Sequence, residues 1–177
     1  MRINWVFATG HKLGAGIKQE QIKSIGPTWG SWQTWKDCGT DNVVCHDIDR
    51  SRELIAKAIQ AVCNFYVPKR YYADLGNPLG VRLYEGEFPQ SVPNAEDIVA
   101  MHLAAGQSEI VLLAGFDFDK LKNEQDRPYH GMARSVINSN PDVQWVLVDH
   151  LHDLGPAYRS LPNLTCDSFK NVLKLLL

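Results

Sequence analysis

The sequence lacks a basic block and a long apolar run. Its only adjacent lysine and arginine are Lys69 and Arg70, and eighteen basic residues stand against twenty acidic ones, for a formal charge of −2. Such a chain offers no continuous positive track for a phosphate backbone, which disfavours nucleic acid as a partner. Segment 1–10 has too few apolar residues for a signal-peptide core or a membrane span, so we expect no membrane partner.

The cysteines show neither a metal-binding nor a disulfide pattern. There is no Cys-x-x-Cys pair and no short Cys/His spacing of the kind that tetrahedral zinc requires. This pattern predicts free thiols in the reducing cytoplasm, and it predicts no metal site. The four residues concerned are Cys38, Cys45, Cys63 and Cys166.

Short apolar runs alternate with helical patterns along the whole chain. The run in 109–116 is unbroken, as is typical of a strand buried on both faces in a parallel sheet. The alternation predicts an α/β fold, a three-layer Rossmann-like sandwich with a mainly parallel sheet of five or six strands. No linker or repeat divides the chain, so we expect a single domain over 1–177. The predicted strands are 3–8, 42–46, 81–84, 110–116, 143–148 and 163–166.

Apolar residues recur with helical period from Leu54 to Tyr66, which predicts a helix of about four turns that ends at Pro68. A second helix is predicted over 95–105, with Asn94 as its cap and Gly106 at its end. Further helices are expected near 131–138 and over 168–176, the last with Asp167 as its cap. Tryptophans at positions 29, 32 and 35 suggest a short helix or 3₁₀ turn that anchors a connection to the core.

Acidic residues follow several of the predicted strands. Because ligands of open α/β sheets bind at the carboxyl ends of the strands, these side chains could converge on one cleft. Asp117 is the strongest candidate, since Gly115 just before it allows a close approach and no helix begins directly after it. The others are Asp47, Asp49, Asp119 and Asp149, with His46, His150 and His152 beside them.

Each of these acids also has a structural interpretation. An Asp after a strand often caps the next helix or forms an Asx turn, and we favour that role for Asp47 or Asp49. The segment 149–153 alternates Asp and His, but a polar loop is favoured there over a metal site. The polar loop 120–129 is read as an exposed loop, with a flap over a site as the alternative.

The turn after the first strand reads Thr9-Gly10-His11-Lys12. Its glycine and lysine could meet a phosphate, which backbone amides of such turns can cradle. The spacing matches neither the dinucleotide fingerprint nor the Walker loop. A plain glycine-containing turn is therefore the alternative.

Residues 94–118 resemble the helix, turn and strand that precede the Gly-x-Asp-Phe element of bacterial sialyltransferases and motility-accessory glycosyltransferase-like proteins. With the segments up to residue 150, the resemblance covers about a third of the chain. It implies a Rossmann-like fold, a nucleotide-activated sugar donor, and His130 as the general base. The family has an Asn-Gly-Pro-Ser type turn after its first strand, where this chain has Thr9-Gly-His-Lys12. The composition is also similar to that of phage and marine-bacterial proteins.

The sequence is therefore compatible with two functions. In the first, a small transferase-like enzyme binds a nucleotide or nucleotide sugar. Asp117 would orient a hydroxyl or a ribose, and His130 would remove a proton. Thr9, Gly10 and Lys12 would meet a phosphate, and Asp119 and Asp149 would add ligand contacts. The sequence does not specify a cofactor.

The second function is a non-catalytic α/β module that binds a partner protein or assembles into a homo-oligomer. Its anchor surface would consist of aromatic side chains, which carry much of the binding energy of protein interfaces when they are exposed. A filled cleft with exposed aromatics would favour the module, and an open cleft with buried tryptophans would favour the enzyme. The aromatic residues concerned are Trp29, Trp32, Trp35, Tyr71 and Tyr72.

Overall fold

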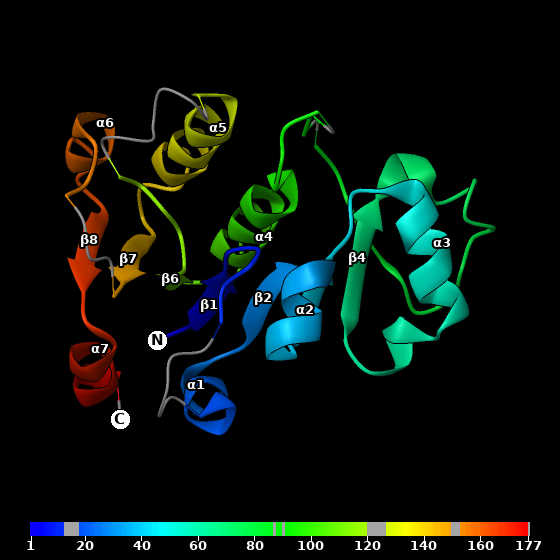
Figure 1. Cartoon of the computed structure of the whole chain (residues 1–177), viewed down its shortest axis with the longest axis horizontal. Helices are drawn as coiled ribbons and strands as arrows, with labels where there is room; N and C mark the ends of the chain where they lie inside the picture. Colours follow the sequence, from blue (N-terminus) through cyan, green and yellow to red (C-terminus); the bar gives the residue numbers. More distant parts are fainter. Residues whose placement is uncertain (13–17, 87, 90, 120–126, 150–152, 177) are drawn as a thin grey trace.

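The computed structural model describes residues 1–12, 18–86, 88–89, 91–119, 127–149 and 153–176. These residues form one sheet of eight strands in the order β5-β4-β3-β2-β1-β6-β7-β8, and every neighbouring pair is parallel (Figure 1). The strands are β1 (Ile3–Phe7), β2 (Thr28–Ser31), β3 (Asn42–Val44), β4 (Asn64–Pro68), β5 (Arg82–Tyr84), β6 (Ile110–Ala114), β7 (Gln144–Val148) and β8 (Leu164–Asp167).

Strand β1 lies in the middle of the sheet and has β2 on one side and β6 on the other. The chain winds outward from β1 to β5, returns, and then winds outward from β6 to β8 in the opposite direction. In the return, Ile3 pairs with Ile110 and Phe7 with Ala114. The order therefore reverses between β1 and β6, and a crevice at such a switch point is where open α/β sheets bind ligands.

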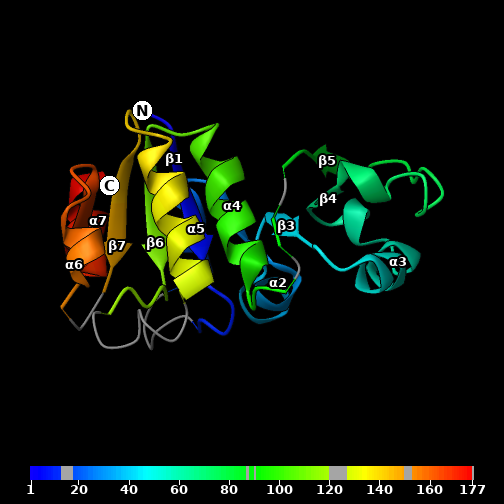
Figure 2. The same cartoon turned by 90° about the horizontal axis from the view of Figure 1, so that it is seen from above.

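Helices cover both faces of the sheet, which gives three layers. The helices α4, α5 and α6 lie on one face, and α1, α2, α3 and α7 lie on the other (Figures 1 and 2). The bounds are α1 (Gln19–Ile25), α2 (Trp32–Cys38), α3 (Ile48–Ala56), α4 (Ala95–Ala105), α5 (Arg127–Asn138), α6 (Pro156–Arg159) and α7 (Phe169–Leu176), with 3₁₀ turns η1 (Ile59–Ala61) and η2 (Lys69–Tyr71).

Successive side chains of the central strands point into different layers. Val6 and Leu113 pack toward α4, whereas Trp5 and Leu112 pack toward α1 and α7. All four are at most 1% exposed. Because both faces of these strands are buried, their sequences are continuous apolar runs and do not alternate between apolar and polar residues.

The predicted three-layer Rossmann-like α/β fold is confirmed, with a sheet of eight strands instead of five or six. Helix α4 has the predicted bounds, and Gly106 follows its last residue. Asp47 caps α3, because its carboxylate accepts a hydrogen bond from the backbone N of Arg50 at 2.6 Å. Within the described residues, no helix is long and apolar enough to cross a membrane.

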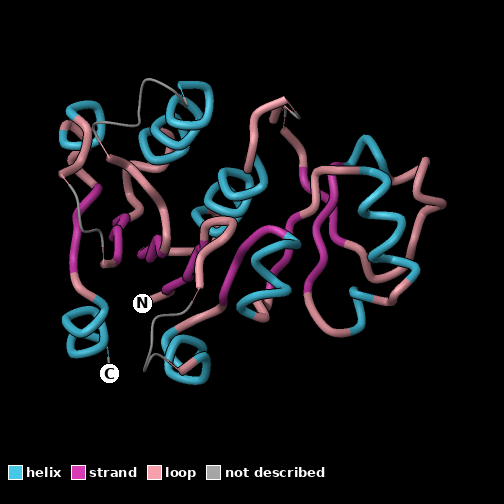
Figure 3. The backbone as a smooth tube through the Cα atoms, in the orientation of Figure 1, coloured by secondary structure: helices cyan, strands magenta, loops and turns pink. Residues whose placement is uncertain are grey.

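The predicted helix from Leu54 to Tyr66 is wrong over its second half. Helix α3 ends at Ala56, Ala58 has a left-handed backbone with φ 56°, and β4 follows the short turn η1. The apolar residues assigned to the end of that helix are Phe65 and Tyr66, which pair with β3 inside the sheet. Aromatic residues favour a strand once a neighbouring strand is present, so tertiary pairing overrides the helical period there. Figure 3 shows the separate cyan helix and magenta strand in this part of the chain.

The tryptophan segment also differs from its prediction. Trp29 belongs to strand β2, is 1% exposed, and packs with its ring centroid 5.1 Å from that of Tyr66. Trp32 and Trp35 lie on helix α2 and pack, half-buried, against the core around Val43. The three-residue spacing therefore spans a strand and a helix that join at Ser31, whose side chain caps α2 by accepting from the backbone N of Thr34 at 3.2 Å.

Candidate functional site

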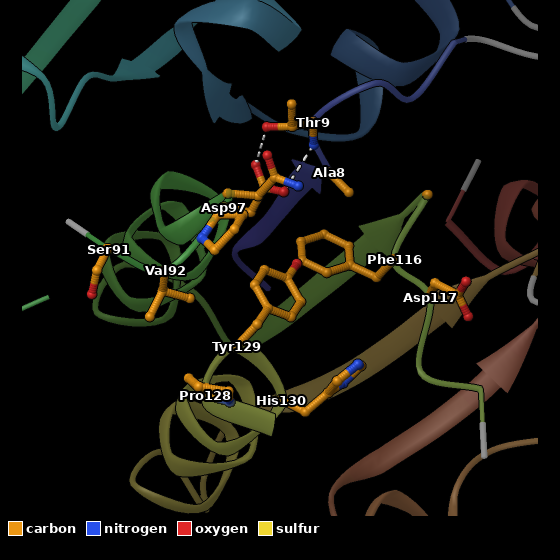
Figure 4. Close-up of a pocket in the computed structure, with 13 residues that line it drawn as sticks. Ala8, Thr9, Ser91, Val92, Asp97, Phe116, Asp117, Pro128, Tyr129 and His130 are labelled. Carbon is orange, nitrogen blue, oxygen red and sulfur yellow. Dashed lines mark hydrogen bonds between the residues drawn. The ribbon is translucent and has the colours of Figure 1, made fainter. Parts of the chain in front are cut away.

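A cavity of about 480 Å³ lies at the carboxyl ends of β1 and β6, at the switch point of the sheet. Four segments that are distant in the sequence line it: the turn after β1, the start of α4, the turn after β6 and the start of α5. Figure 4 shows Asp97 and Thr9 toward one end of this site, Asp117 and His130 toward the other, and the rings of Phe116 and Tyr129 between them. The lining residues are 8–9, 91–94, 97, 115–117 and 128–130.

Asp97 holds the turn after β1 in place from the first turn of α4. Its side chain is 1% exposed, and its two carboxylate oxygens accept hydrogen bonds from the backbone N of Thr9 at 2.9 Å and from Thr9 Oγ1 at 2.7 Å. Burial raises the pKa of Asp97 to about 7, and the two bonds from Thr9 oppose that rise. Thr9 Oγ1 also lies 2.8 Å from Ser31 Oγ, so one hydrogen-bonded chain joins α4, β1 and β2.

Two helices of 11 and 12 residues begin at the cavity. The residues of the first turn of α4 and of α5 that line it are Asp97 and 128–130. The first backbone N–H groups of a helix lack intrahelical partners and carry partial positive charge. Together the two helix starts make the cavity favourable for electronegative ligand atoms, while the side chains of Asp97 and Asp117 supply hydrogen-bond acceptors.

His130 enters the cavity wall from α5 and is 2% exposed. Its Nδ1 lies 2.6 Å from the hydroxyl of Tyr158, which also donates to the backbone carbonyl of His130 at 3.4 Å. When the tyrosine hydroxyl donates to that carbonyl, it accepts from Nδ1–H, and Nε2 is then the basic nitrogen of the neutral ring. Tyr158 is itself fixed by stacking on Phe118, with ring centroids 4.1 Å apart.

Replacing Tyr158 with phenylalanine should lower the free energy of unfolding by about 1–2 kcal/mol, because buried His130 Nδ1 loses its partner. The matched control is Tyr72→Phe, since the half-buried Tyr72 makes no side-chain hydrogen bond within the described residues. Urea unfolding measures both variants, and side-chain ¹⁵N spectra report the His130 tautomer. Equal stability of the two variants would contradict the role given to Tyr158.

Asp117 is half-buried and lines the cavity after β6. Its Oδ1 accepts a hydrogen bond from the backbone N of Asp119 at 3.2 Å, which is the geometry of an Asx turn. The Asx-turn interpretation that the sequence suggested for other acids thus applies at Asp117 too. The turn begins at Gly115, whose φ of +79° is in the left-handed region.

The structure brings Thr9, Asp117 and His130 to one cavity and places the other predicted ligand residues outside its wall. Gly10 and Lys12 are exposed at the edge of the sheet, next to Thr9 in sequence. Asp119 is buried and bridges to the backbone of Leu154.

Asp149 and the remaining acids have structural partners. Asp149 accepts a hydrogen bond from the backbone N of Phe169 at 2.8 Å and so helps to begin α7, while Ser168 rather than Asp167 accepts from Asn171 N within that helix. Asp49 pairs with Arg52 on α3. The residues 120–126 of the polar loop and His150 and His152 lie outside the described residues.

Sequence reasoning missed Asp97 and Tyr129. An acid in the first turn of a helix is favourable without any further role, so Asp97 does not stand out in the sequence. In the structure, the residues that follow it in α4, from Ile98 to Met101, are all fully buried. Four consecutive apolar residues cover every side of a helical turn and so indicate a buried helix, and an acid beside such a turn is expected to be paired. That pattern could have identified Asp97. Within the described part of the chain, no group of three His, Cys, Asp or Glu residues is arranged to hold a metal ion.

Comparison with family models, curated proteins and solved structures found no match to this chain.

Proposed function

We propose that the switch-point cavity binds a nucleotide or a nucleotide sugar and that the chain is a small glycosyltransferase-like enzyme. The observation that carries the proposal is the convergence of Thr9, Asp117 and His130 on one open cavity from three separate segments. The cavity combines carboxylates, which accept bonds from sugar hydroxyls, with the aromatic faces of Phe116 and Tyr129, which suit a flat apolar ring. The cytoplasm remains the proposed compartment, because none of the four cysteines, all of which the structure describes, forms a disulfide.

The proposed transfer assigns one role to each of two residues. His130 takes the proton of the acceptor hydroxyl while that oxygen bonds to the anomeric carbon of the donor, and the bond from that carbon to the phosphate oxygen breaks, so the phosphate leaves with the electron pair. Asp117 orients a hydroxyl of the sugar or ribose. A general base of this kind contributes about two to four orders of magnitude in rate.

The alternative of a non-catalytic interaction module has less support. Of its five candidate anchors, Trp29 is 1% exposed and packs on Tyr66 inside the fold. The other four are half-buried, with Trp32 and Trp35 packed against the core. An interface anchor must be accessible to its partner, whereas the cavity at the sheet edge is open.

A panel of nucleotides, nucleotide sugars and free sugars tests the proposal by thermal shift and calorimetry. A ligand present at a hundred times its dissociation constant should raise the melting temperature by on the order of 5 °C. Asp117→Asn should weaken binding of that ligand about tenfold, because one good hydrogen bond to a charged group is lost. Asp142→Asn is the control, since Asp142 is exposed in the turn before β7. A panel without any stabilising member would count against the proposal.

The role of His130 is tested by transfer rather than by binding. His130→Gln should keep the affinity for the donor within a few fold and reduce the transfer rate by about 10²–10⁴. His102→Gln, an exposed position on α4, controls for the loss of a histidine. Transfer at the unchanged rate in His130→Gln would remove His130 from the mechanism.

A further inference from the structure

A second polar cluster lies at the carboxyl ends of β3, β4 and β5, on the same edge of the sheet as the switch-point cavity. His46 follows β3, Arg70 lies in the turn η2 that follows β4, and Tyr84 ends β5. A hollow of about 340 Å³ opens there, and Lys69, Arg70 and Tyr84 are among its lining residues. None of these residues belongs to the switch-point cavity.

Buried groups hold His46 in a fixed, neutral state. His46 and Tyr84 are 6% and 4% exposed, and His46 Nδ1 lies 2.6 Å from the Tyr84 hydroxyl. On the other side of the ring, Arg70 Nη2 lies 3.3 Å from His46 Nε2. A guanidinium group can only donate, so Nε2 is the acceptor and the ring is uncharged. Burial, and then the charge of Arg70, lower the pKa of His46, which agrees with this assignment.

Among the described residues, the groups that contact the Arg70 guanidinium are uncharged. In addition to its contact with His46, the Arg70 guanidinium carbon lies 5.0 Å from the centroid of the Tyr71 ring, and Nη2 donates to the Tyr71 hydroxyl at 3.5 Å. The nearby acids are engaged elsewhere, since Glu85 pairs with Lys69 and a Glu96 carboxylate oxygen accepts from the backbone N of His46 at 2.7 Å. Within the described residues no carboxylate pairs with Arg70, although its guanidinium is always charged.

We propose that Arg70, presented by His46 and assisted by Lys69, forms a binding site for a phosphoryl group. The planar fork of Arg matches two oxygens of a phosphate, and a fork held in place before binding loses less entropy when the anion arrives. Lys69 can take part because its pair with Glu85 is exposed, and an exposed ion pair contributes little and is easily exchanged for another partner. The site stands independently of the proposed function. The two sites flank the first turn of α4, where Glu96 contacts His46 and Asp97 lines the cavity.

Calorimetric titration of the full chain with inorganic pyrophosphate at low ionic strength tests the site. Arg70→Gln should weaken pyrophosphate binding at least tenfold. The control is Arg82→Gln, because Arg82 begins β5 and so carries the same charge at the opposite end of the strand. It should change the affinity less than twofold. If both variants weakened binding equally, the effect would be due to net charge alone, and the proposal would be wrong. It would also be wrong if the unchanged protein bound no pyrophosphate.

Side-chain ¹⁵N spectra of His46 provide a second readout that a loss of stability would not reproduce. Bound pyrophosphate competes for the Arg70 guanidinium, so the Nε2 resonance of His46 should shift on titration in the unchanged protein and stay in place in Arg70→Gln. Circular dichroism shows whether that variant is folded. A His46 resonance that does not respond in the unchanged protein would contradict the site.

Two sources of the phosphoryl group are distinguished by comparing pyrophosphate with a nucleoside diphosphate. A free anion as the ligand predicts similar affinities for the two compounds. A nucleotide as the ligand predicts at least tenfold tighter binding of the diphosphate, with loss in both Arg70→Gln and Asp117→Asn. Either result supports the Arg70 site, provided that Arg70→Gln weakens binding. If Asp117→Asn left the affinity for the nucleoside diphosphate unchanged while the protein still bound pyrophosphate, the result would count against the proposed function and not against the Arg70 site.

Discussion

Gly115→Ala should lower the free energy of unfolding by about 2–4 kcal/mol. The backbone conformation at this position is unfavourable for alanine, and there is no room for the added methyl group. Gly115 has a φ of +79°, and an ideal Cβ there would lie 2.5 Å from His11 Nδ1 and 2.7 Å from His11 Cβ. The clash reaches the root of the histidine side chain, so rotation of the ring does not relieve it. His11 also stacks on Phe7, with ring centroids 5.5 Å apart. Urea unfolding measures the loss.

Two other glycines separate the causes of this effect. Gly10 has a φ of +83° and nothing within 4 Å of an added Cβ, so Gly10→Ala should cost only about 1 kcal/mol, the cost of the left-handed backbone. Gly106 has a φ of −62°, and its nearest contact would be Leu103 O at 3.7 Å, so Gly106→Ala should stay within about 0.5 kcal/mol. If Gly115→Ala cost no more than Gly10→Ala, the close packing of His11 would be disproved.

The contribution of Asp97 to stability should fall as the pH rises from about 4 to about 7, because Asp97 is easier to ionise in the unfolded chain than in the fold. Burial raises the pKa of Asp97 from 3.8 to about 7. The folded state therefore holds a proton that the unfolded state releases, so the stabilisation is complete below pH 3.8 and is lost through pH 7. Between pH 5 and pH 8 we expect a loss of about 3 kcal/mol from this group.

Asp97→Asn tests this assignment, because the amide does not titrate. Glu96, whose pKa is also raised to about 7 by burial first, remains in the variant and titrates over the same range. The loss of stability between pH 5 and pH 8 should therefore shrink by about half in Asp97→Asn, as measured by urea unfolding at both pH values. An unchanged pH profile would show that Asp97 is not the titrating group.

The strands that the sequence predicts correctly are short apolar or alternating segments that lie between polar turns. The run at 110–116 and the acid after it are visible because the strand is buried on both faces and stops at a glycine. Strands β2 and β4 are not predicted from the sequence, because their residues fit helical spacings. Trp29 is spaced like the tryptophans of helix α2, and Tyr66 is spaced like the apolar residues of helix α3. Only their pairing in the sheet, which local sequence does not record, decides between helix and strand.

The candidate site divides in the same way. Thr9 and Asp117 are found because they follow strands, and His130 is found through the resemblance of its segment. Asp149 also follows a strand, but its left-handed backbone, with φ 54°, directs its carboxylate to the start of α7. Asp97 is missed because a residue inside a helix carries no strand-end signal, although its burial and its bonds to Thr9 make it a central residue of the cavity wall.

The pairing of β1 with β6 has a consequence for how the molecule assembles. Ile3 meets Ile110 only after more than half of the chain has been synthesised, and closing such a long loop opposes early contact. The part of the sheet from β1 to β5 and the part from β6 to β8 must therefore pair, through β1 and β6, before the cavity can form. Retention of the proposed ligand would then report that β1 and β6 have paired. If the proposed binding is real, a chain cut within 85–94 should bind only when its two pieces reassociate.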